Sequence, residues 1–534
     1  MVLPFRQFSG RTRRLFCYAS GILFIDIDFV MPVRAQGGPC MHEDRIMLRQ
    51  LENRIMTAEE AAHMIKRGMT IGASGFTAVG YPKVIPKAIA KLGEAHSLNV
   101  IAGASCGDEM DGELARAGLM AFRAPFNVNA DVRRQINEGA IRYVDMHLSH
   151  LPQAVRSGVF GKPDVAIIEC CMITDKGGIV PTLSVGASNA LVERSKKVIL
   201  ELNMSQPAKL YGMHDIFNIS RLPTKDLLNI VNVNDRIGGP AIFCDPDKIA
   251  AIVITDAKDQ EPRFLPGDET SSRIAGHVID LLRQNMAQGC IPRNFTIQSG
   301  FGTIANAVLA ELTSDEFGVL NMYTEVAQDS ALELILAGKI QSTSATALSL
   351  STKGRKLLYD NLDSLHSRIV LRPQDISNNA GVIRALGVIA MNTAIEVDIY
   401  GNVNSTHIMG SGMMNGLGGS GDFARNSAMS IFMTPSTAKN GKISSIVPMV
   451  PHVDHTEHDV QFIVTEQGFA DLRGKSPNER ASLIIERCAH PDYRPSLREY
   501  YEAARRSANA MHTPHNLAAA FSWHRKFLAE GSML

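Results

Sequence analysis

Four glycines crowd into six residues of the stretch MMNGLGGSGDFARNS (413–427), at Gly416, Gly418, Gly419 and Gly421. Such a density costs backbone entropy, so it suggests that another group must approach this backbone closely. Exposed N–H groups there could form an oxyanion hole, which stabilises a developing negative charge. A flexible surface loop is the alternative. The preceding EVDIYGNVNST (396–406) predicts a hairpin with an Asn/Gly turn that would hold the loop rigidly.

A second glycine-rich stretch, SGFGTIANAV (299–308), lies where a predicted strand turns into a predicted helix. Backbone N–H groups at such a turn can bind an anionic or phosphate-bearing ligand. The stretch lacks the spacing of a dinucleotide-binding fingerprint and the lysine of a P-loop. Ligand binding and an ordinary tight turn therefore both stay open.

Glu325, in LNMYTEVAQDSALELI (320–335), stands where a β-rich segment meets an amphipathic helix. A carboxylate at the carboxyl end of a strand is well placed for catalysis. It could equally be a helix-start residue favoured by the helix dipole, and periodicity alone favours this second interpretation.

The segment HVDHTEHD (452–459) contains three histidines and three acids and could in principle bind a metal. The histidines at 452, 455 and 458 have a spacing that matches neither HExxH nor the common zinc patterns. We expect a polar turn whose side chains bond one another and nearby backbone beneath the active site.

Short β-rich segments alternate with helical patterns along most of the chain. In the first series the strand candidates are LNVIAGAS (98–105), PDVAIIECCMI (163–173) and KKVILELN (196–203). A second series comprises strands in IAAIVIT (249–255), NFTIQSG (294–300), GVLNMYTE (318–325), GVIAMNTAIEVDIYG (387–401) and VQFIVTEQG (460–468), and helices over 303–312, 326–337, 476–488 and 495–507. This alternation is typical of crossover units on mostly parallel sheets and predicts an α/β fold.

The two series resemble each other internally. TIGASGFTAVGYPKVIPKAIAKL (70–92) and TIQSGFGTIANAVLAEL (296–312) both predict a strand, a Ser-Gly-Phe turn and a helix. We predict two related open α/β domains, 41–230 and 231–534, with the boundary near 225–245, where NVNDRIGGPAIFCDPDK collects turn-forming residues. Because ligands of such sheets bind at the carboxyl ends of strands, the active site is expected between the domains, at these turns and after NMYTE.

The composition favours a globular protein that acts on small molecules. The 534 residues are 45% apolar, and Lys+Arg and Asp+Glu balance at 54 each, so no basic surface for nucleic acid is indicated. The eight cysteines form no CxxC pair, which fits a reducing cytoplasm. Cys170 and Cys171, in an apolar segment, are expected to be buried small hydrophobes rather than reactive thiols.

The first 40 residues differ from the rest. Arginines at 6, 11, 13 and 14 precede LFCYASGILFIDIDFV (15–30), which resembles a targeting segment until Asp26 and Asp28 interrupt it. No uninterrupted apolar span of ~20 residues occurs, so a membrane helix is not expected. We predict that the fold starts near Met41, where a capping-box pattern at Thr57 and Glu60 follows, and that 1–40 is disordered or not translated.

These motifs together resemble the acetyl-CoA hydrolase/transferase family, and within it the class I CoA-transferases that use succinyl-CoA and acetate. The resemblance runs from about residue 50 to 530 and is carried in order by SGFGTIANAV, YTEVAQD, EVDIYGNVNSTH, NGLGGSGDFARN, ISSIVPMV, HVDHTEHDV and TEQGFADLRG. It implies the CoA-transferase fold, with no metal and no permanently bound cofactor, and coenzyme A as a substrate. A homodimer, without membrane or nucleic acid partners, is also implied.

The resemblance also implies a mechanism. Glu325 would attack an acyl-CoA thioester to give a mixed anhydride, and the CoA thiolate would then form a covalent glutamyl-CoA thioester. The Asn378 amide and the Gly419 N–H would form the oxyanion hole, and Glu466 of TEQG is expected near the site. The implied CoA-binding residues are Gly300, Phe301, Gly302, Thr303, Ile304, Ile395, Asn415, Gly419 and Lys439, the lysine offering a cation for the phosphates.

Three functions remain open at this point. The first is a CoA-transferase that converts succinyl-CoA and acetate to acetyl-CoA and succinate. The second is an acetyl-CoA hydrolase in which water resolves the same glutamyl intermediate, because only the exclusion of water separates the two activities. The third is a metabolite-sensing or scaffold protein that has lost catalysis. Carboxylate preference depends on pocket volume, which residue identities do not reveal.

Overall fold

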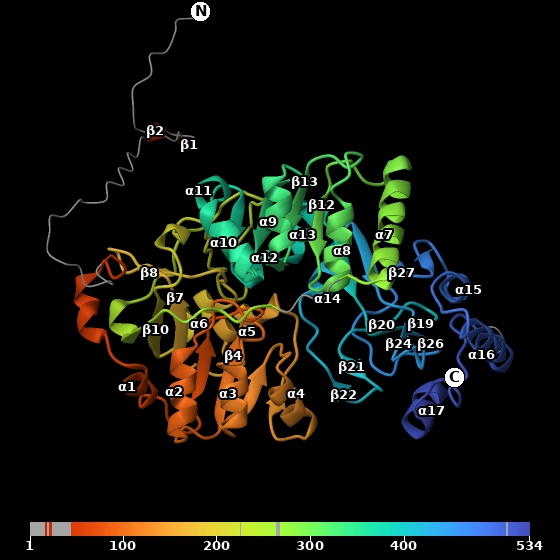
Figure 1. The fold of residues 1–534 in the computed structure, drawn as a ribbon, viewed down its shortest axis with the longest axis horizontal. Coiled ribbons are helices and arrows are strands. Elements are labelled where there is room, and N and C mark those ends of the chain that lie inside the picture. The colour runs from red at the N-terminus through yellow and green to blue at the C-terminus, as the bar shows by residue number, and fades with distance from the viewer. Residues whose placement is uncertain (1–15, 19–20, 24–43, 225, 263–266, 509–510) are drawn as a thin grey trace, which may run out of the picture. The chain divides into compact units, whose positions relative to one another are not determined.

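The computed structural model of the protein describes residues 16–18, 21–23, 44–224, 226–262, 267–508 and 511–534 (Figure 1). The chain divides into two units, Met1–Glu43 and Asp44–Leu534. In the first unit, β1 (Phe16–Tyr18) pairs antiparallel with β2 (Gly21–Leu23). The four arginines and two aspartates of the amino-terminal segment, and the predicted start at Met41, lie outside the described residues.

The second unit contains the predicted α/β fold, built on two large sheets. The first sheet has seven parallel strands in the order β11-β10-β7-β3-β4-β5-β6. Their bounds are β3 Thr70–Ala73, β4 Leu98–Ala102, β5 Met120–Ala124, β6 Arg142–Tyr143, β7 Val165–Cys170, β10 Lys197–Asn203 and β11 Ile249–Thr255. The strands predicted over 98–105, 163–173 and 196–203 are confirmed as β4, β7 and β10. Every residue of β7 is buried, as expected for a parallel strand covered on both faces.

The second sheet has eight strands in the order β17-β15-β13-β12-β18-β23-β27-β28, parallel except for the edge strand β28. Their bounds are β12 Thr296–Ser299, β13 Leu320–Tyr323, β15 Ile340–Ala345, β17 Ile369–Leu371, β18 Ile389–Thr393, β23 Met429–Met433, β27 Phe462–Thr465 and β28 Gly468–Asp471. The predicted second series is confirmed except at its first member. The segment 249–255 is a strand, but β11 pairs with β10 of the first sheet.

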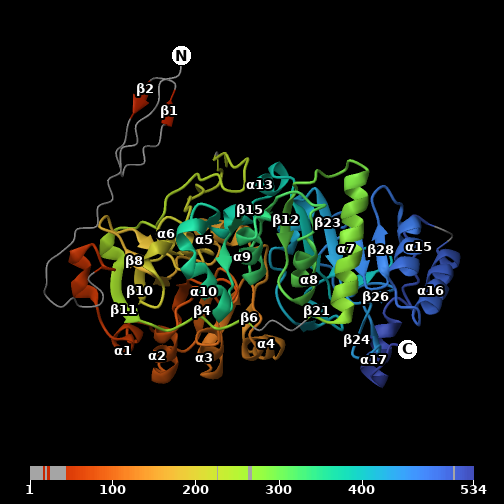
Figure 2. The same cartoon turned by 45° about the horizontal axis from the view of Figure 1, so that its top comes forward.

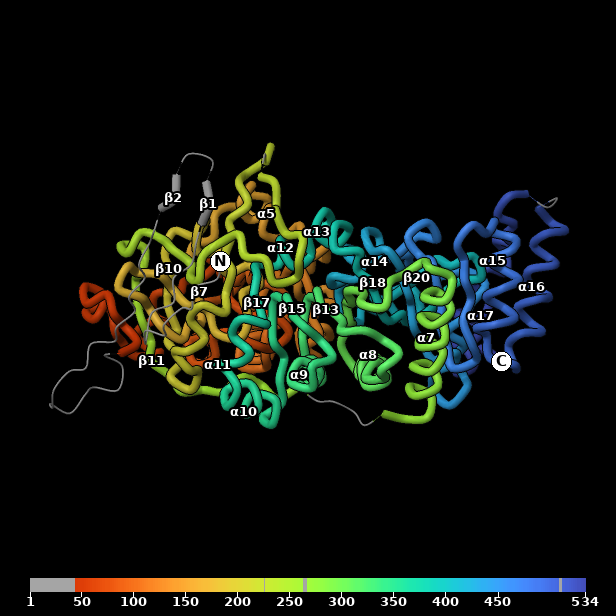
Figure 3. The backbone as a smooth tube through the Cα atoms, turned by 90° about the horizontal axis from the view of Figure 1, so that it is seen from above, coloured from red at the N-terminus to blue at the C-terminus, as the bar shows by residue number. Residues whose placement is uncertain are grey.

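Helices cover both faces of each large sheet. Figure 3 shows β17, β15, β13 and β18 between α8–α10 on one side and α12–α14 on the other. Figure 2 shows α2 and α3 on the face of the first sheet that points away from the second sheet, while α5 and α6 lie on the opposite face. The helix bounds in the first part of the chain are α1 Ala58–Ala62, α2 Val84–Leu92, α3 Asp111–Arg116, α4 Ala130–Asn137, α5 His150–Ser157 and α6 Ser188–Arg194. In the second part they are α7 Glu269–Ala287, α8 Thr303–Glu311, α9 Asp329–Leu336, α10 Thr352–Asp360, α11 Leu362–Leu365, α12 Gln374–Ser377, α13 Ala380–Ala385, α14 Ser420–Asn426, α15 Pro477–Arg487, α16 Arg494–Ser507 and α17 Ser522–Glu530.

Local signals in the sequence fix several of these elements. The predicted capping box is present at α1, where Thr57 and Glu60 satisfy each other's backbone N–H groups. The predicted hairpin is also present, since β19 (Glu396–Asp398) pairs antiparallel with β20 (Val403–Asn404). A parallel strand, β26 (Ile446–Val447), completes a small sheet beside it. This hairpin leads into the glycine-rich stretch.

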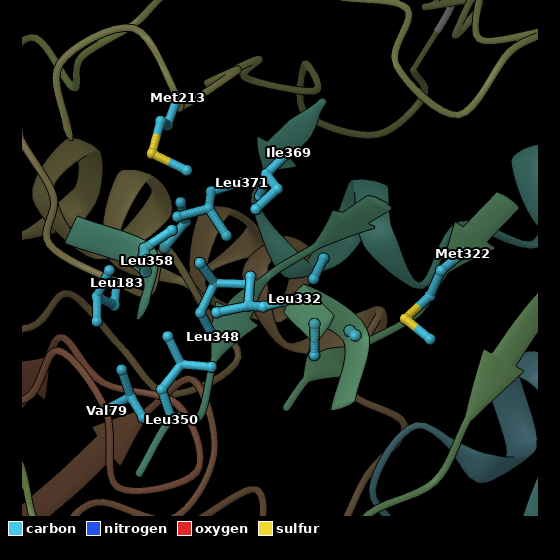
Figure 4. Packing of buried hydrophobic residues seen from close by; sticks show 14 of the residues in the cluster. Val79, Leu183, Met213, Met322, Leu332, Leu348, Leu350, Leu358, Ile369 and Leu371 are labelled. Atoms are coloured by element: carbon cyan, nitrogen blue, oxygen red, sulfur yellow. The ribbon is translucent and has the colours of Figure 1, made fainter. Parts of the chain in front are cut away.

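One apolar cluster joins the two large sheets. Figure 4 shows Val79 and Leu183, which belong to the first part of the chain, packed near Leu348, Leu350 and other side chains of the second part. Burying each large aliphatic side chain contributes roughly 1.5–3 kcal/mol. The apolar contacts therefore hold the two sheets together.

The predicted domain boundary at residue 230 precedes β11, the outermost strand of the first sheet. The chain from 231 onward therefore contributes one strand to the first sheet before it enters α7. Cys170 and Cys171 are buried, as predicted. Burial raises the pKa of both thiols, that of Cys171 to about 12, so both are protonated at neutral pH.

Candidate active site

A cavity of about 690 Å³ lies between the two sheets, at the carboxyl ends of several of their strands. Residues that follow β3 and β4, including Thr77 and Ser105, form one wall, and residues at the carboxyl ends of β12 and β18 and after β13 form the other. The second Ser-Gly-Phe turn and the loop after β13 therefore border the cavity, as the parallel-sheet rule predicted, whereas the first turn reaches it only through Thr77 and Ala78, which follow Phe76. The glycine-rich residues 415–420 close it.

Glu325 is partly buried and lines this cavity. It stands between β13 and the short strand β14 (Val326–Ala327), and its carbonyl oxygen accepts hydrogen bonds from the N–H groups of Thr346 and Ala347 at 3.0 and 3.3 Å. Helix α9 begins only at Asp329. The helix-start interpretation of Glu325 is therefore wrong: strand pairing, rather than the helix dipole, fixes this residue.

The oxyanion-hole candidates lie directly beside the Glu325 carboxylate. The Asn378 side chain and the Gly419 backbone both donate hydrogen bonds to it. A Cβ added at Gly419 would lie 2.0 Å from Oε2 of Glu325 and 2.3 Å from Nδ2 of Asn378. Only glycine leaves room for this arrangement, which gives a physical reason for this residue of the cluster.

Burial and a neighbouring negative charge raise the pKa of Glu325 to about 8. Loss of solvation is the largest cause, the charge of Asp422 adds to it, and the hydrogen bonds from Asn378 and Gly419 oppose both. A carboxyl group with such a pKa is basic enough to be a good nucleophile once it is ionised.

Asp422 is a site residue that the sequence did not reveal. It lies in the first turn of α14 and is 7% exposed, and its Oδ2 accepts a hydrogen bond from Nδ2 of Asn378 at 3.3 Å. An acid in the first turn of a helix has an ordinary cause in the helix dipole. Only the fold brings it next to Asn378, so no signal in the sequence distinguishes it.

The glycine-rich stretch is anchored rather than loose. The N–H of Leu417 donates to both carboxylate oxygens of Asp145, at 3.0 and 2.8 Å, and Asn137 exchanges two hydrogen bonds with the backbone of Met413. Burial raises the pKa of Asp145 to about 7. The flexible-loop alternative is therefore wrong, because residues of the first part of the chain clamp this loop.

The structure brings some of the predicted CoA-binding residues to the cavity. Gly300, Phe301, Asn415 and Gly419 line it, and Phe301 is 44% exposed. Asn415 donates to the carbonyl oxygens of Ser405 and Gly416, at 3.1 and 2.8 Å, which shapes the wall.

Other predicted CoA-binding residues lie outside the cavity walls. Gly302, with φ +119°, precedes α8, and Thr303 and Ile304 begin that helix. The N–H of Ile395 donates to the carbonyl oxygen of Asn404. Lys439 is exposed, and its Nζ lies 5.1 Å from the ring centroid of Phe527.

Glu466 is buried but does not line the cavity. Its carboxylate accepts hydrogen bonds from the N–H and hydroxyl of Ser436 and from Nε2 of Gln467. Burial opposes ionisation, but these hydrogen bonds outweigh it and lower the pKa of Glu466. The ionised carboxylate thus fixes the loop that follows β23.

The segment 452–459 forms a polar support beneath the glycine-rich loop, as predicted. Asp454 accepts hydrogen bonds from the N–H of Ser405 and the hydroxyl of Thr406. His455 is buried against Phe432, and its Nε2 lies 3.0 Å from the hydroxyl of Ser420. Burial lowers the pKa of His455 to about 4, so the imidazole is neutral.

Within the described part of the chain, no cluster of three or more histidine, cysteine or acidic side chains is arranged to hold a metal ion. The described helices also include none with the length and apolar character that crossing a membrane requires.

Sequence comparison matches two family models to the chain. The acetyl-CoA hydrolase/transferase N-terminal domain matches residues 41–254, and the C-terminal domain matches residues 354–501. A succinyl-CoA:acetate CoA-transferase of Clostridium kluyveri is 49% identical over 92% of each chain. A propanoyl-CoA:succinate CoA transferase of Escherichia coli is 44% identical over 90% of this chain and 98% of its own. An acetyl-CoA hydrolase of Schizosaccharomyces pombe is 43% identical over 93% of this chain and 99% of its own.

Solved structures agree on the fold. A 4-hydroxybutyrate CoA-transferase from Porphyromonas gingivalis superimposes with a TM-score of 0.60 at 23% identity, over 86% of this chain and 99% of its own. RipA from Yersinia pestis superimposes with a TM-score of 0.67 at 22% identity, over 87% of this chain and 99% of its own. With two family models that span more than half of its length, and relatives above 40% identity along nearly all of it, the chain belongs to the acetyl-CoA hydrolase/transferase family.

Proposed function

We propose that the protein is a CoA-transferase that moves CoA between an acyl-CoA and a free short carboxylate through a covalent thioester on Glu325. The observation that carries the proposal is the contact among Glu325, Asn378 and Gly419, where a Cβ on the glycine would lie 2.0 Å from the carboxylate. The transferases among the relatives support the reaction class.

In the first half-reaction, an ionised carboxylate oxygen of Glu325 attacks the thioester carbonyl carbon. The carbon–sulfur bond breaks, CoA leaves as the thiolate, and a mixed acyl-glutamyl anhydride forms. The thiolate then attacks the glutamyl carbonyl carbon and expels the acyl group as its free carboxylate. The incoming carboxylate reverses both steps and leaves as the new acyl-CoA.

The two N–H groups suit the second of these steps in particular. When sulfur attacks the glutamyl carbonyl, negative charge develops on an oxygen of Glu325 itself. The Asn378 amide and the Gly419 N–H already contact that carboxylate, so they stabilise the charge without reorganisation. Removal of one such donor typically costs about 10²- to 10³-fold in rate.

The test is the mass of the protein after incubation with acyl-CoA and no acceptor. We expect an adduct of the mass of CoA on the peptide that carries Glu325, and we expect Glu325→Ala to lack it. A wild-type protein that turns over without any such adduct would refute the covalent mechanism.

Net hydrolysis is the second candidate, favoured by the acetyl-CoA hydrolases of Schizosaccharomyces pombe and Candida albicans, 43% and 41% identical to this chain. In that reaction water attacks the acyl-glutamyl or glutamyl-CoA intermediate. Release of free CoA thiol, measured with and without acetate or succinate, separates the two. Full turnover without an acceptor would overturn the transferase assignment, whereas CoA binding without thioester exchange would indicate a protein that has lost catalysis.

The remaining features of the proposal follow the family resemblance. Succinyl-CoA and acetate are the proposed substrate pair. We propose that the protein acts on them in the cytoplasm as a homodimer and needs no bound cofactor. A panel of acyl-CoA and carboxylate pairs identifies the substrates, light scattering measures whether the particle has twice the chain mass, and cell fractionation tests the location.

A further inference from the structure

Asp422 is a buried carboxylate that touches the oxyanion machinery without lining the cavity. It lies in α14, the helix that begins directly after Gly419. Its hydrogen-bond donors do not come from its own helix. Oδ1 accepts from the hydroxyl of Ser149 at 2.6 Å, and Oδ2 accepts from the N–H of Ser149 at 3.1 Å and from Nδ2 of Asn378 at 3.3 Å.

These contacts fix the orientation of the Asn378 amide. Its Oδ1 accepts from the hydroxyl of Ser377 at 2.7 Å, and one of its N–H groups is bonded to Asp422. A primary amide carries one acceptor and two N–H groups, so the second N–H is left for Glu325. Rotating the amide by half a turn would place its oxygen against the Asp422 carboxylate and lose the donor to the nucleophile.

We infer that Asp422 is a positioning residue for the transfer reaction: it holds one N–H of Asn378 on Glu325 and polarises the amide toward the developing oxyanion. An N–H bonded to a carboxylate belongs to a strong, charge-assisted pair, which resists rotation of the amide. The inference rests on the proposed function, because it assigns Asn378 a role in that reaction.

The charge of Asp422 has a second effect on the site. A carboxylate near Glu325 disfavours ionisation of the nucleophile, in line with the raised pKa of Glu325. The groups that face Asp422 are His147, whose Nδ1 lies 3.8 Å from Oδ1, and His150 of α5. Any pH effect must therefore be separated from histidine titration.

Two substitutions separate position from charge. In Asp422→Asn the side-chain oxygen can accept from both the Ser149 N–H and Asn378, while its amide donates to the Ser149 hydroxyl, so the geometry survives and the charge is lost. Asp422→Ala removes both. Asp363→Asn is the matched control, because Asp363 is exposed and paired with Lys209 on the surface.

For Asp422→Ala we expect kcat to fall by about 10²-fold with little change in KM, the signature of a misplaced donor to the transition state. For Asp422→Asn we expect a smaller loss of kcat. We also expect the acid limb of the pH profile, where kcat/KM falls as Glu325 is protonated, to move to lower pH by about one unit. In His147→Gln the acid limb of the kcat/KM profile should stay at the wild-type pH. Thermal unfolding is measured for each variant, and the Asp422→Asn profile decides the question if the alanine variant does not fold.

The inference is overturned if wild type forms the Glu325 adduct while Asp422→Asn keeps both the wild-type limb and the wild-type kcat. It is also overturned if folded Asp422→Ala retains kcat, or if His147→Gln moves the limb and Asp422→Asn does not. Failure of the proposed function is distinguishable, since wild type itself would then form no adduct.

Discussion

Replacing Gly419 with alanine tests the geometry of the oxyanion site directly. The new Cβ would lie 2.0 Å from Oε2 of Glu325 and 2.3 Å from Nδ2 of Asn378. Non-bonded heavy atoms prefer a separation of about 3.5 Å, so the carboxylate and the amide must withdraw by about 1 Å or more. A displacement of this size costs about 10²-fold in rate, or about 2.7 kcal/mol of transition-state stabilisation.

The backbone itself tolerates this substitution. Gly419 has φ −93° and ψ 0°, a conformation that alanine adopts without strain. We therefore expect the thermal unfolding midpoint to change little while kcat falls. Gly276→Ala in α7 is the matched control, because no atom beyond the adjacent residues and the backbone of its own helix lies within 4 Å of its added Cβ, and the helix tolerates alanine better than glycine.

The assay is steady-state exchange between acyl-CoA and free carboxylate, with the rate of Glu325 adduct formation measured in parallel. Both kcat and the adduct rate should fall for Gly419→Ala and stay at the wild-type level for Gly276→Ala. A folded Gly419→Ala protein with wild-type kcat would refute the conclusion that this backbone N–H must contact the Glu325 carboxylate.

Three further predictions concern titration and local stability. The kcat/KM of wild type should rise with pH through a pKa of about 8, because the proposed nucleophile is the ionised Glu325 carboxylate and protonation removes it. A flat profile between pH 6 and pH 9 would contradict this assignment. Asp145 has a pKa raised to about 7, so its contribution to folding stability is fully present below its unfolded pKa and is lost as pH rises through about 7. Asp145→Asn should therefore gain in unfolding midpoint relative to wild type between pH 5 and pH 8, and an unchanged difference would show that Asp145 is not perturbed. Ser476→Ala should lose about 1 kcal/mol of stability, because Ser476 and Glu479 form the capping box of α15. This helix lies far along the chain from Glu325, so kcat should not change. Equal unfolding midpoints of the variant and wild type would argue against that cap.

The sequence predicted local elements well because each has its own local cause. Apolar runs such as 165–170 become buried parallel strands, and the Thr57 pattern becomes a helix cap. The strand at 249–255 was predicted as a strand but assigned to the wrong series. Its apolar pattern indicates burial, whereas its pairing with β10 depends on where the long segment 204–248 leads the chain.

The candidate site was predicted in part, for a related reason. Glycine density marked the loop around Gly419, because so many glycines in a short stretch cost backbone entropy unless a close approach requires them. Glu325 was ambiguous because a carboxylate before a helix is common. Asp422 carried no signal, since its partners Ser149 and Asn378 lie far away in sequence and meet only in the fold.

The apparent repeat also shows how similar strings can diverge in three dimensions. Phe76, in the first Ser-Gly-Phe turn, is fully buried, whereas Phe301, in the second, is 44% exposed and borders the cavity. The phenylalanine of one turn belongs to the core, and that of the other forms part of the cavity wall.

The anchoring of the glycine-rich loop by Asn137, Asp145 and Ser149 has a consequence for any attempt to divide this enzyme. Consider two fragments produced separately, one that ends after β11 and one that begins at α7. The second would contain the glycine-rich loop without the residues that anchor it, and the first would contain those residues without the loop. Neither piece could catalyse alone, yet a mixture should recover turnover as the fragments reassociate. The recovered rate, titrated against fragment concentration, would then measure the affinity of one part of the protein for the other.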